Sequence, residues 1–95
     1  MFEVQLSKRA QKDLDALSAD CFKKISSQLR TLGGSHFPDK KRIKKIKGIK
    51  ESLYRLRVDT QNDSYRIFFI LEKPNTVIVL SVVPKKQADR YLRTL

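Results

Sequence analysis

The 95-residue sequence predicts one α+β domain, residues 1–95, with the element order β-α-α-β-β-β-α. Three observations predict it. One N-terminal segment alternates apolar and polar residues, and the next two segments repeat apolar residues every three or four positions. Three later segments are rich in β-branched and aromatic residues. This order is typical of a mostly antiparallel, twisted sheet, here four-stranded, with a helical hairpin on one face and a short C-terminal helix.

The first third of the chain predicts a strand and two helices. Residues 2–6, FEVQL, alternate as a half-buried strand does. Ser7 is a suitable N-cap for a first helix, and Ser18 or Asp20 for a second. Gly33-Gly34 is expected to end the second helix. The predicted apolar stripes are Ala10, Leu14 and Leu17 in the first helix, and Phe22, Ile25, Leu29 and Leu32 in the second.

The rest of the chain predicts a connection, three strands and a helix. Residues 35–49 are expected to be irregular and basic, anchored by three isoleucines. Strands are predicted at about 53–58, 65–72 and 76–83, with polar turns between them and Pro84 at the end of the last. Residues 85–95 predict a short helix whose inward residues are Ala88, Leu92 and Leu95.

Composition excludes several classes of function. Cys21 and His36 are the only cysteine and histidine, which excludes an internal disulfide, a cysteine metal cluster and a paired-histidine ribonuclease mechanism. We therefore expect no metal and no organic cofactor. No apolar run approaches the roughly 20 residues of a membrane span, and the N-terminus lacks the apolar block of a signal peptide. A cytoplasmic protein without a membrane partner is the expectation.

The positive charge is concentrated in one stretch. Residues 40–57, KKRIKKIKGIKESLYRLR, hold nine basic residues against Glu51 alone, so +8 of the net +11 lies there. Such a concentration indicates a polyanionic partner: nucleic acid, an acidic protein or an anionic membrane surface. The alternative is a solvated lysine-rich loop. Because the charge continues into a predicted strand, we favour binding.

Three arginines on the predicted strands could form an anion site. Residues two apart share one face of a strand, so Arg55 and Arg57 point the same way. The following hairpin can bring Arg66 close to either of them. Three neighbouring guanidinium groups repel one another unless an anion lies among them, and their forks match phosphate oxygens. The alternative is that they only cover an exposed face, paired with Asp59, Asp63 or Glu72.

The segments YRLRV, SYRIFFIL and VLSVVPKKQADRY, with the basic connection, resemble the RelE/ParE superfamily of bacterial toxins over nearly the whole chain. The likeness is to the RelE-like branch. It implies the toxin of a type II toxin–antitoxin system, a ribosome-dependent mRNA endoribonuclease that cuts in the A site and inhibits translation. The family's catalytic positions fall on Arg55, Arg57, Arg66, Lys85 and Tyr91.

The implied chemistry is attack of a ribose 2′-hydroxyl on the adjacent phosphate, which gives a 2′,3′-cyclic phosphate and a 5′-hydroxyl. Arg57 and Arg66 would hold the scissile phosphate, and Lys85 would protonate the leaving 5′-oxygen. Tyr91 would stack on or orient a base, although a lone tyrosine is more often a packing residue. Active members often carry lysine where Arg55 stands, and a guanidinium cannot act as a base. Charge stabilisation alone, a ribosomal group or slow turnover would explain the difference.

The resemblance also implies partners. These are an acidic antitoxin, with which a heterotetramer or a larger complex is compatible, and the ribosome with its mRNA. Two other functions stay open: inhibition of DNA gyrase without hydrolysis, as in the ParE branch, and a degenerate homologue that binds only an antitoxin or nucleic acid. The residues expected to contact RNA or the ribosome are Lys40, Lys41, Arg42, Lys44, Lys45, Lys47, Lys50 and Lys86.

Overall fold

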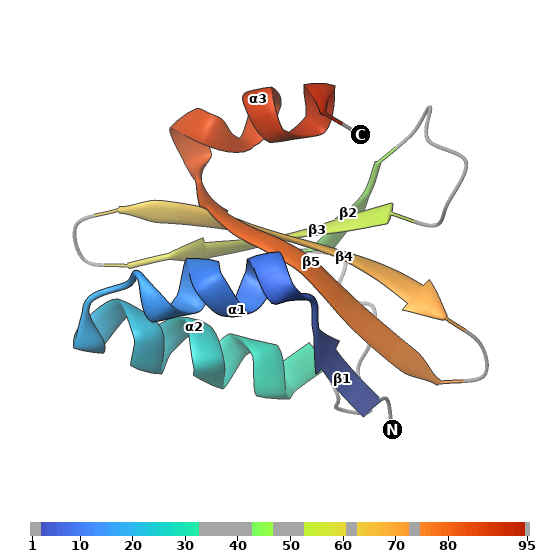
Figure 1. Cartoon of the computed structure of the whole chain (residues 1–95), viewed down its shortest axis with the longest axis horizontal. Helices are drawn as coiled ribbons and strands as arrows, with labels where there is room; N and C mark the ends of the chain where they lie inside the picture. Colours follow the sequence, from blue (N-terminus) through green and yellow to red (C-terminus); the bar gives the residue numbers. More distant parts are fainter. Residues whose placement is uncertain (1–2, 33–42, 47–52, 61–62, 73–74, 95) are drawn as a thin grey trace.

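The structure, a computed structural model, describes residues 3–32, 43–46, 53–60, 63–72 and 75–94 (Figure 1). Five strands, three α-helices and one 3₁₀ turn follow one another along this part of the chain. They are β1 (Glu3–Leu6), α1 (Lys8–Asp15), α2 (Ala19–Leu32), β2 (Ile43–Lys45), β3 (Leu53–Asp59), β4 (Ser64–Glu72), β5 (Thr76–Pro84), η1 (Lys85–Gln87) and α3 (Ala88–Arg93). Within these residues, no helix has both the length and the apolar content that a membrane crossing requires.

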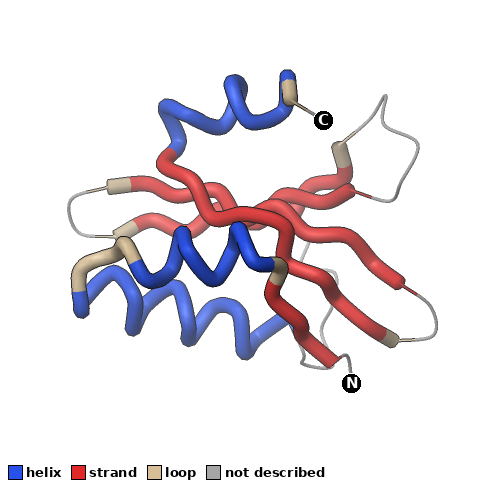
Figure 2. The backbone as a smooth tube through the Cα atoms, in the orientation of Figure 1, coloured by secondary structure: helices blue, strands red, loops and turns tan. Residues whose placement is uncertain are grey.

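The strands form one sheet in the order β1-β5-β4-β3-β2 (Figure 2). β1 runs parallel to β5, and all other neighbours are antiparallel. The predicted mixed α+β architecture is confirmed, with each of the four predicted strands present. The prediction that residues 35–49 are irregular was wrong for Ile43–Lys45, which pair with β3 as an additional edge strand. Ile43 is buried opposite Leu56, and this apolar contact holds the short, lysine-rich strand in place.

The two faces of the sheet are covered by different helices. α1 and α2 lie along one face and α3 lies against the other, as Figure 1 shows. The larger core cluster lies under α1 and α2, and it includes Ile67 and Phe69 of β4. The smaller cluster lies under α3 and includes Phe68. Successive residues of β4 therefore point to opposite faces, as the alternation of the sequence predicts.

The helical hairpin follows its predicted caps and most of its predicted stripe. The Ser7 hydroxyl accepts a hydrogen bond from the Ala10 amide at 3.0 Å, and the Ser18 hydroxyl accepts one from Cys21 at 3.4 Å. The prediction for Phe22 was wrong, because its side chain is 41% exposed. Phe22 lies at the margin of the stripe, one residue round the helix from Cys21, which packs against the core. The predicted Gly33-Gly34 stop lies outside the described residues.

An irregularity in β5 changes which of its side chains face α3. The pairing with β4 shifts between Phe68 and Phe69, so that Phe68 faces Ser81 while Phe69 faces Val79. Leu80 is the additional residue on β5. A bulge of this kind breaks the two-residue period, so that Val79 and Val82, three residues apart, both lie in the cluster under α1 and α2, while Leu80 and Val83 pack in the cluster under α3.

Candidate functional site

The arginines lie together on the sheet face opposite α1 and α2. We call this the arginine face, defined by Arg55, Arg57 and Arg66. Arg57 stands directly opposite Arg66 across the β3–β4 ladder, and Arg55 stands opposite Phe68. Directly opposite residues have Cβ atoms about 4.5–5.5 Å apart, and like charges in this position are destabilising. The hairpin therefore places two arginines side by side, with the third arginine in the next residue pair on the same face.

Arg66 is the most deeply placed of the three, because its side chain is only 7% exposed. One guanidinium nitrogen donates to the carbonyl oxygen of the preceding residue, Tyr65, at 3.2 Å. Burial is the main cause that lowers the pKa of Arg66, and repulsion from Arg55 and Arg57 adds to it while Asp59 opposes it. Among the described residues, no carboxylate oxygen lies within the 4.0 Å of an ion pair with Arg66. A buried cation thus keeps donors that an anion could use.

Arg57 is exposed and has a carboxylate neighbour on its own strand. Its Nε lies 3.6 Å from Oδ2 of Asp59, two residues further along β3. The hydroxyl of Ser64, opposite Asp59 on β4, donates a hydrogen bond to Asp59 Oδ1. This bond lowers the pKa of Asp59, and the positive charges of Arg57, Arg66 and Lys24 lower it further. The pairing with Asp59 that belonged to the alternative interpretation of the arginines is thus present for Arg57.

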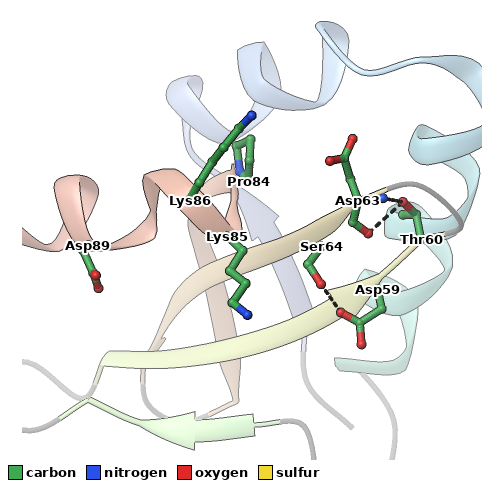
Figure 3. A pocket seen from close by; sticks show the side chains of 8 residues that line it. All are labelled: Asp59, Thr60, Asp63, Ser64, Pro84, Lys85, Lys86 and Asp89. Carbon is green, nitrogen blue, oxygen red and sulfur yellow. Dashed lines mark hydrogen bonds between the residues drawn. The ribbon is translucent and has the colours of Figure 1, made fainter.

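Lys85 lies where β5 gives way to η1, as the sequence predicts for a basic residue at the end of the last strand. It borders an open pocket of about 600 Å³ between the β3–β4 turn and η1 (Figure 3). Asp59 and Ser64 line the sheet side of this pocket, and Lys85 extends toward the sheet from the η1 side. The pocket also includes Thr60, Asp63, Pro84, Lys86 and Asp89. It continues the arginine face beyond Arg57.

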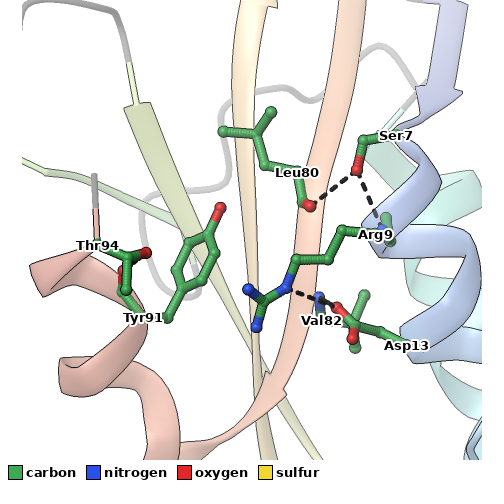
Figure 4. Close-up of polar contacts among 8 residues, drawn as sticks. Ser7, Arg9, Asp13, Leu80, Val82, Tyr91 and Thr94 are labelled. Atoms are coloured by element: carbon green, nitrogen blue, oxygen red, sulfur yellow. Dashed lines mark hydrogen bonds and ion pairs between the residues drawn. The ribbon is translucent and has the colours of Figure 1, made fainter.

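Tyr91 lies on the same face of the sheet but is not an exposed platform. It is 7% exposed, and its ring packs on Phe68 with centroids 4.9 Å apart and planes tilted by 30°. The Arg9 guanidinium of α1 lies 4.8 Å from the centre of the Tyr91 ring (Figure 4). Burial raises the pKa of Tyr91, while the nearby Ser81 hydroxyl and Arg9 oppose the shift. A base can stack on this ring only if Arg9 or α3 moves.

Arg9 reaches Tyr91 past the half of β5 that β1 does not cover. β1 pairs with Thr76–Val79 alone. Beyond that point, the N-cap of α1 and a residue of its later half bind the free backbone of β5. The Ser7 hydroxyl donates to the Leu80 carbonyl at 2.8 Å, and the Val82 amide donates to Asp13 at 2.9 Å (Figure 4). Asp13 also lies 3.7 Å from Arg9. α1 is thereby linked to both the sheet edge and α3.

The structure describes only some of the other basic residues that are predicted to contact RNA or the ribosome. Lys45 and Lys86 are exposed. Lys44 belongs to β2, but its side chain is not described. Lys40, Lys41, Arg42, Lys47 and Lys50 lie outside the described residues. Among the residues that are described, no group of His, Cys, Asp and Glu side chains is arranged to hold a metal ion.

Three side chains near the site were missed by the sequence analysis as contributors. Asp59 had a signal, because it shares the alternation of Arg55 and Arg57 and was named there only as a surface partner. Ser64 becomes visible only with the register of the hairpin, which places it opposite Asp59. Arg9 had no sequence signal, since its contact with Tyr91 joins opposite ends of the chain.

Comparison with known proteins identifies the family. Residues 12–95 match the family described as "Phage derived protein Gp49-like (DUF891)". The chain belongs to this Gp49-like family. No curated protein matches the Gp49-like chain.

Three solved structures with the same fold contain RelE proteins. The RelE–RelB complex from Pyrococcus horikoshii OT3 matches with a TM-score of 0.71 and 22% identity, over 88% of this chain and 94% of that one. The isolated RelE toxin of E. coli matches with a TM-score of 0.66 and 16% identity, over 100% of both chains. The intact E. coli RelBE toxin–antitoxin complex matches with a TM-score of 0.66 and 17% identity, over 87% of this chain and 95% of that one. The Gp49-like chain thus has the RelE fold, and the predicted membership of the RelE-like superfamily is confirmed.

Proposed function

We propose that this Gp49-like protein is the toxin of a type II toxin–antitoxin system and that it cleaves mRNA in the ribosomal A site. The RelE fold supports the toxin class, since one matching structure is described as a RelE–RelB complex and another as the RelBE toxin–antitoxin complex. The observation that carries the nuclease proposal is Arg66. It is buried, stands opposite Arg57, and has no carboxylate partner among the described residues.

A buried cation without an ion-pair partner is costly for the folded protein, and the attraction of Asp59 offsets only part of the burial that lowers the pKa of Arg66. Repulsion from Arg55 and Arg57 adds to that cost. An RNA phosphate between Arg57 and Arg66 would remove both penalties, and it would accept hydrogen bonds from two guanidinium forks. The same donors gain strength as the phosphate acquires additional charge in the transition state, which is the requirement for catalysis.

The remaining catalytic positions are proposed with separate roles. Lys85, across the pocket from Asp59, would donate a proton to the leaving 5′-oxygen. Arg55, beside Phe68, would contact a neighbouring phosphate of the same strand. Tyr91 would orient a base once Arg9 leaves its ring or α3 shifts. The chain's own basic residues thus supply phosphate binding and a general acid.

The proposal also assigns the partners. The basic connection, together with Lys45 and Lys86, would bind ribosomal RNA through its phosphates. The residues of the protein that we propose to bind RNA are Lys40, Lys41, Arg42, Lys44, Lys45, Lys47, Lys50 and Lys86. An acidic antitoxin would neutralise the +11 chain and cover the arginine face until it is removed. Such a toxin would act in the cytoplasm, where mRNA is translated.

Primer extension on an mRNA translated in a purified bacterial system tests the proposal. Wild-type protein should create new 3′ ends within A-site codons, and only when ribosomes are present. Arg66→Ala should slow cleavage by about 10²–10³-fold, as expected for loss of one group that stabilises transition-state charge. Arg30→Ala is the matched control, because it removes the same charge from an exposed position on α2 and should cleave normally. Intact mRNA with folded wild-type protein would overturn the proposal, and inhibition of DNA gyrase would be measured next.

A further inference from the structure

The geometry points to Asp59 as the general base that removes the proton from the attacking 2′-hydroxyl. This inference rests on the proposed function and completes it, because the three arginines of the site stay protonated and cannot accept a proton. It stands on the position of Asp59 beside the arginine pair, on the pocket that it borders, and on the two side chains that fix its carboxylate.

The first support is the order of residue pairs along the β3–β4 ladder. Arg57 faces Arg66, and the next pair on the same face is Asp59 with Ser64. Residues two apart in a strand are separated by about 6.4–6.8 Å. A phosphate held by Arg57 and Arg66 would therefore have the Asp59 carboxylate as its neighbour on one side. The 2′-oxygen belongs to the ribose that carries this phosphate on its 3′-oxygen, and the inference requires that this ribose lies on the Asp59 side.

The second support is the pocket of about 600 Å³ that begins at Asp59 and Ser64. Figure 3 shows Asp59 on the hairpin side of this pocket and Lys85 on the η1 side. In-line displacement at phosphorus requires that the attacking and leaving oxygens lie on opposite sides of the phosphorus atom. A carboxylate on one side and an ammonium on the other match these two requirements, since the carboxylate can take a proton and the ammonium can give one.

The third support is that the Asp59 carboxylate is ionised and oriented. Ser64 donates to Oδ1, and Arg57 Nε lies 3.6 Å from Oδ2. The Ser64 bond and the neighbouring cations also hold the pKa of Asp59 below its ordinary value. A carboxylate of low pKa is a weak base in bulk water, but a fixed position next to the reacting hydroxyl compensates through effective concentration.

The other acidic residues of the pocket are less well placed. Asp63 also lines a second pocket on the helical face, with Cys21 and Tyr65, and its carboxylate points away from Lys85 in Figure 3. Asp89 belongs to α3, on the far side of the pocket from the hairpin. Neither lies within ion-pair distance of an arginine of the arginine face among the described residues. Asp59 is the carboxylate that contacts Arg57, one member of the phosphate-binding pair.

The proposed step balances with these groups alone. Asp59 accepts the proton of the 2′-hydroxyl while the 2′-oxygen forms a bond to phosphorus. The bond from phosphorus to the 5′-oxygen breaks, and Lys85 gives its proton to that oxygen. The products are a 2′,3′-cyclic phosphate and a 5′-hydroxyl. Water then takes the proton from Asp59 and returns one to Lys85.

The alternative explanation is that Asp59 only forms a surface ion pair with Arg57, and such pairs contribute little to stability. Single-turnover cleavage on ribosomes programmed with a defined mRNA separates the two. We expect Asp59→Asn to lower the cleavage rate about 10²–10⁴-fold, the range for loss of a positioned base. Binding of the variant to the programmed ribosome should be unchanged. Asp63→Asn, which removes the same charge from the neighbouring turn, should cleave at the wild-type rate.

A substrate with sulfur in place of the leaving 5′-oxygen gives the decisive readout. A thiolate leaves without a proton, because a thiol has a pKa of about 8.5. The cleavage rate of Lys85→Ala should therefore return toward the wild-type rate on the sulfur substrate, whereas the rate of Asp59→Asn should stay low. Recovery of Asp59→Asn would place this residue on the leaving-group side, and wild-type cleavage by Asp59→Asn would show a merely structural pair. Either result overturns the inference while the nuclease function stands. Absence of cleavage by the wild-type protein overturns both.

Discussion

The two faces of the β3–β4 hairpin are built from alternate residues of the same two strands, yet they have opposite character. The face under α1 and α2 carries only apolar or aromatic side chains: Tyr54, Leu56, Val58, Tyr65, Ile67 and Phe69. The arginine face carries Leu53, Arg55, Arg57, Asp59, Ser64, Arg66, Phe68 and Ile70. Both faces bury large side chains, since Phe68 and Phe69 are each fully buried.

The difference shows how so small a protein can hold a costly site. The helical face holds the larger of the two clusters of buried hydrophobic residues, and it fixes the register of the hairpin. That register then places Arg57 against Arg66, an arrangement which the arginine face alone would not favour. Strain of this kind persists only where the surrounding structure determines the conformation. We infer that the fold is held by one face so that the other can bind an anion.

The largest effects should come from the two adjacent phenylalanines. Phe69→Ala and Phe68→Ala should each lower the free energy of unfolding by about 3–5 kcal/mol, as truncation of a fully buried aromatic residue does. Phe69→Ala should cost more, because Phe69 lies in the larger of the two clusters. Urea denaturation at equilibrium measures both. Phe22→Ala is the matched control and should cost less than about 1 kcal/mol, since Phe22 is exposed. A larger loss in Phe68→Ala would reverse our ranking of the faces.

The next effect has the opposite sign. Arg66→Met should raise the free energy of unfolding by about 1–2 kcal/mol, because it replaces a buried, repelled cation by an apolar side chain of similar length. The same variant should lose mRNA cleavage. Thermal denaturation should show a rise of several degrees, given that 1 kcal/mol corresponds to about 4–8 °C in a domain of this size.

A matched measurement sharpens that test. Inorganic phosphate should stabilise the wild-type protein by binding the folded state, and it should stabilise Arg66→Met less. Arg30→Met removes an exposed charge and should retain the wild-type response. If Arg66→Met unfolds more easily than the wild type, then Arg66 contributes more to packing than it costs in charge burial. The contrast between the faces would then be weaker than we infer.

The sequence predicted the two faces well and their lateral contacts poorly. Alternation alone separates Arg55 and Arg57 from Leu56, because the two-residue period is a property of every strand. Which residue faces Arg66 depends on the register, and the sequence left Arg55 and Arg57 as equal candidates. β2 was missed because lysines dominate its composition, and a single buried isoleucine is a weak strand signal. The burial of Tyr91 follows from its packing on Phe68 of β4 and from the contact with Arg9 of α1, which no local pattern reports.

The smallest predicted effect concerns Arg9, which links the helical side of the molecule to the arginine face. Arg9→Met should lower the free energy of unfolding by about 0.5–1 kcal/mol, the value of an exposed cation–π contact. It should also raise the pKa of Tyr91 further, since Arg9 opposes the increase that burial causes. Ultraviolet titration of the tyrosines, with Tyr91→Phe to assign the signal, measures this change.

The sign of the pH effect follows from the direction of that shift. Tyr91 has a folded-state pKa above its ordinary value of 10.0, so its contribution to stability is present below that pH and is lost as the pH rises through the folded-state pKa. In Arg9→Met this loss should continue to higher pH. If neither the stability nor the tyrosine titration changes, Arg9 does not hold Tyr91, and the packing on Phe68 keeps the ring in place. If both change and mRNA cleavage rises, Arg9 and an RNA base compete for the same aromatic ring, and access to Tyr91 limits the activity of the site.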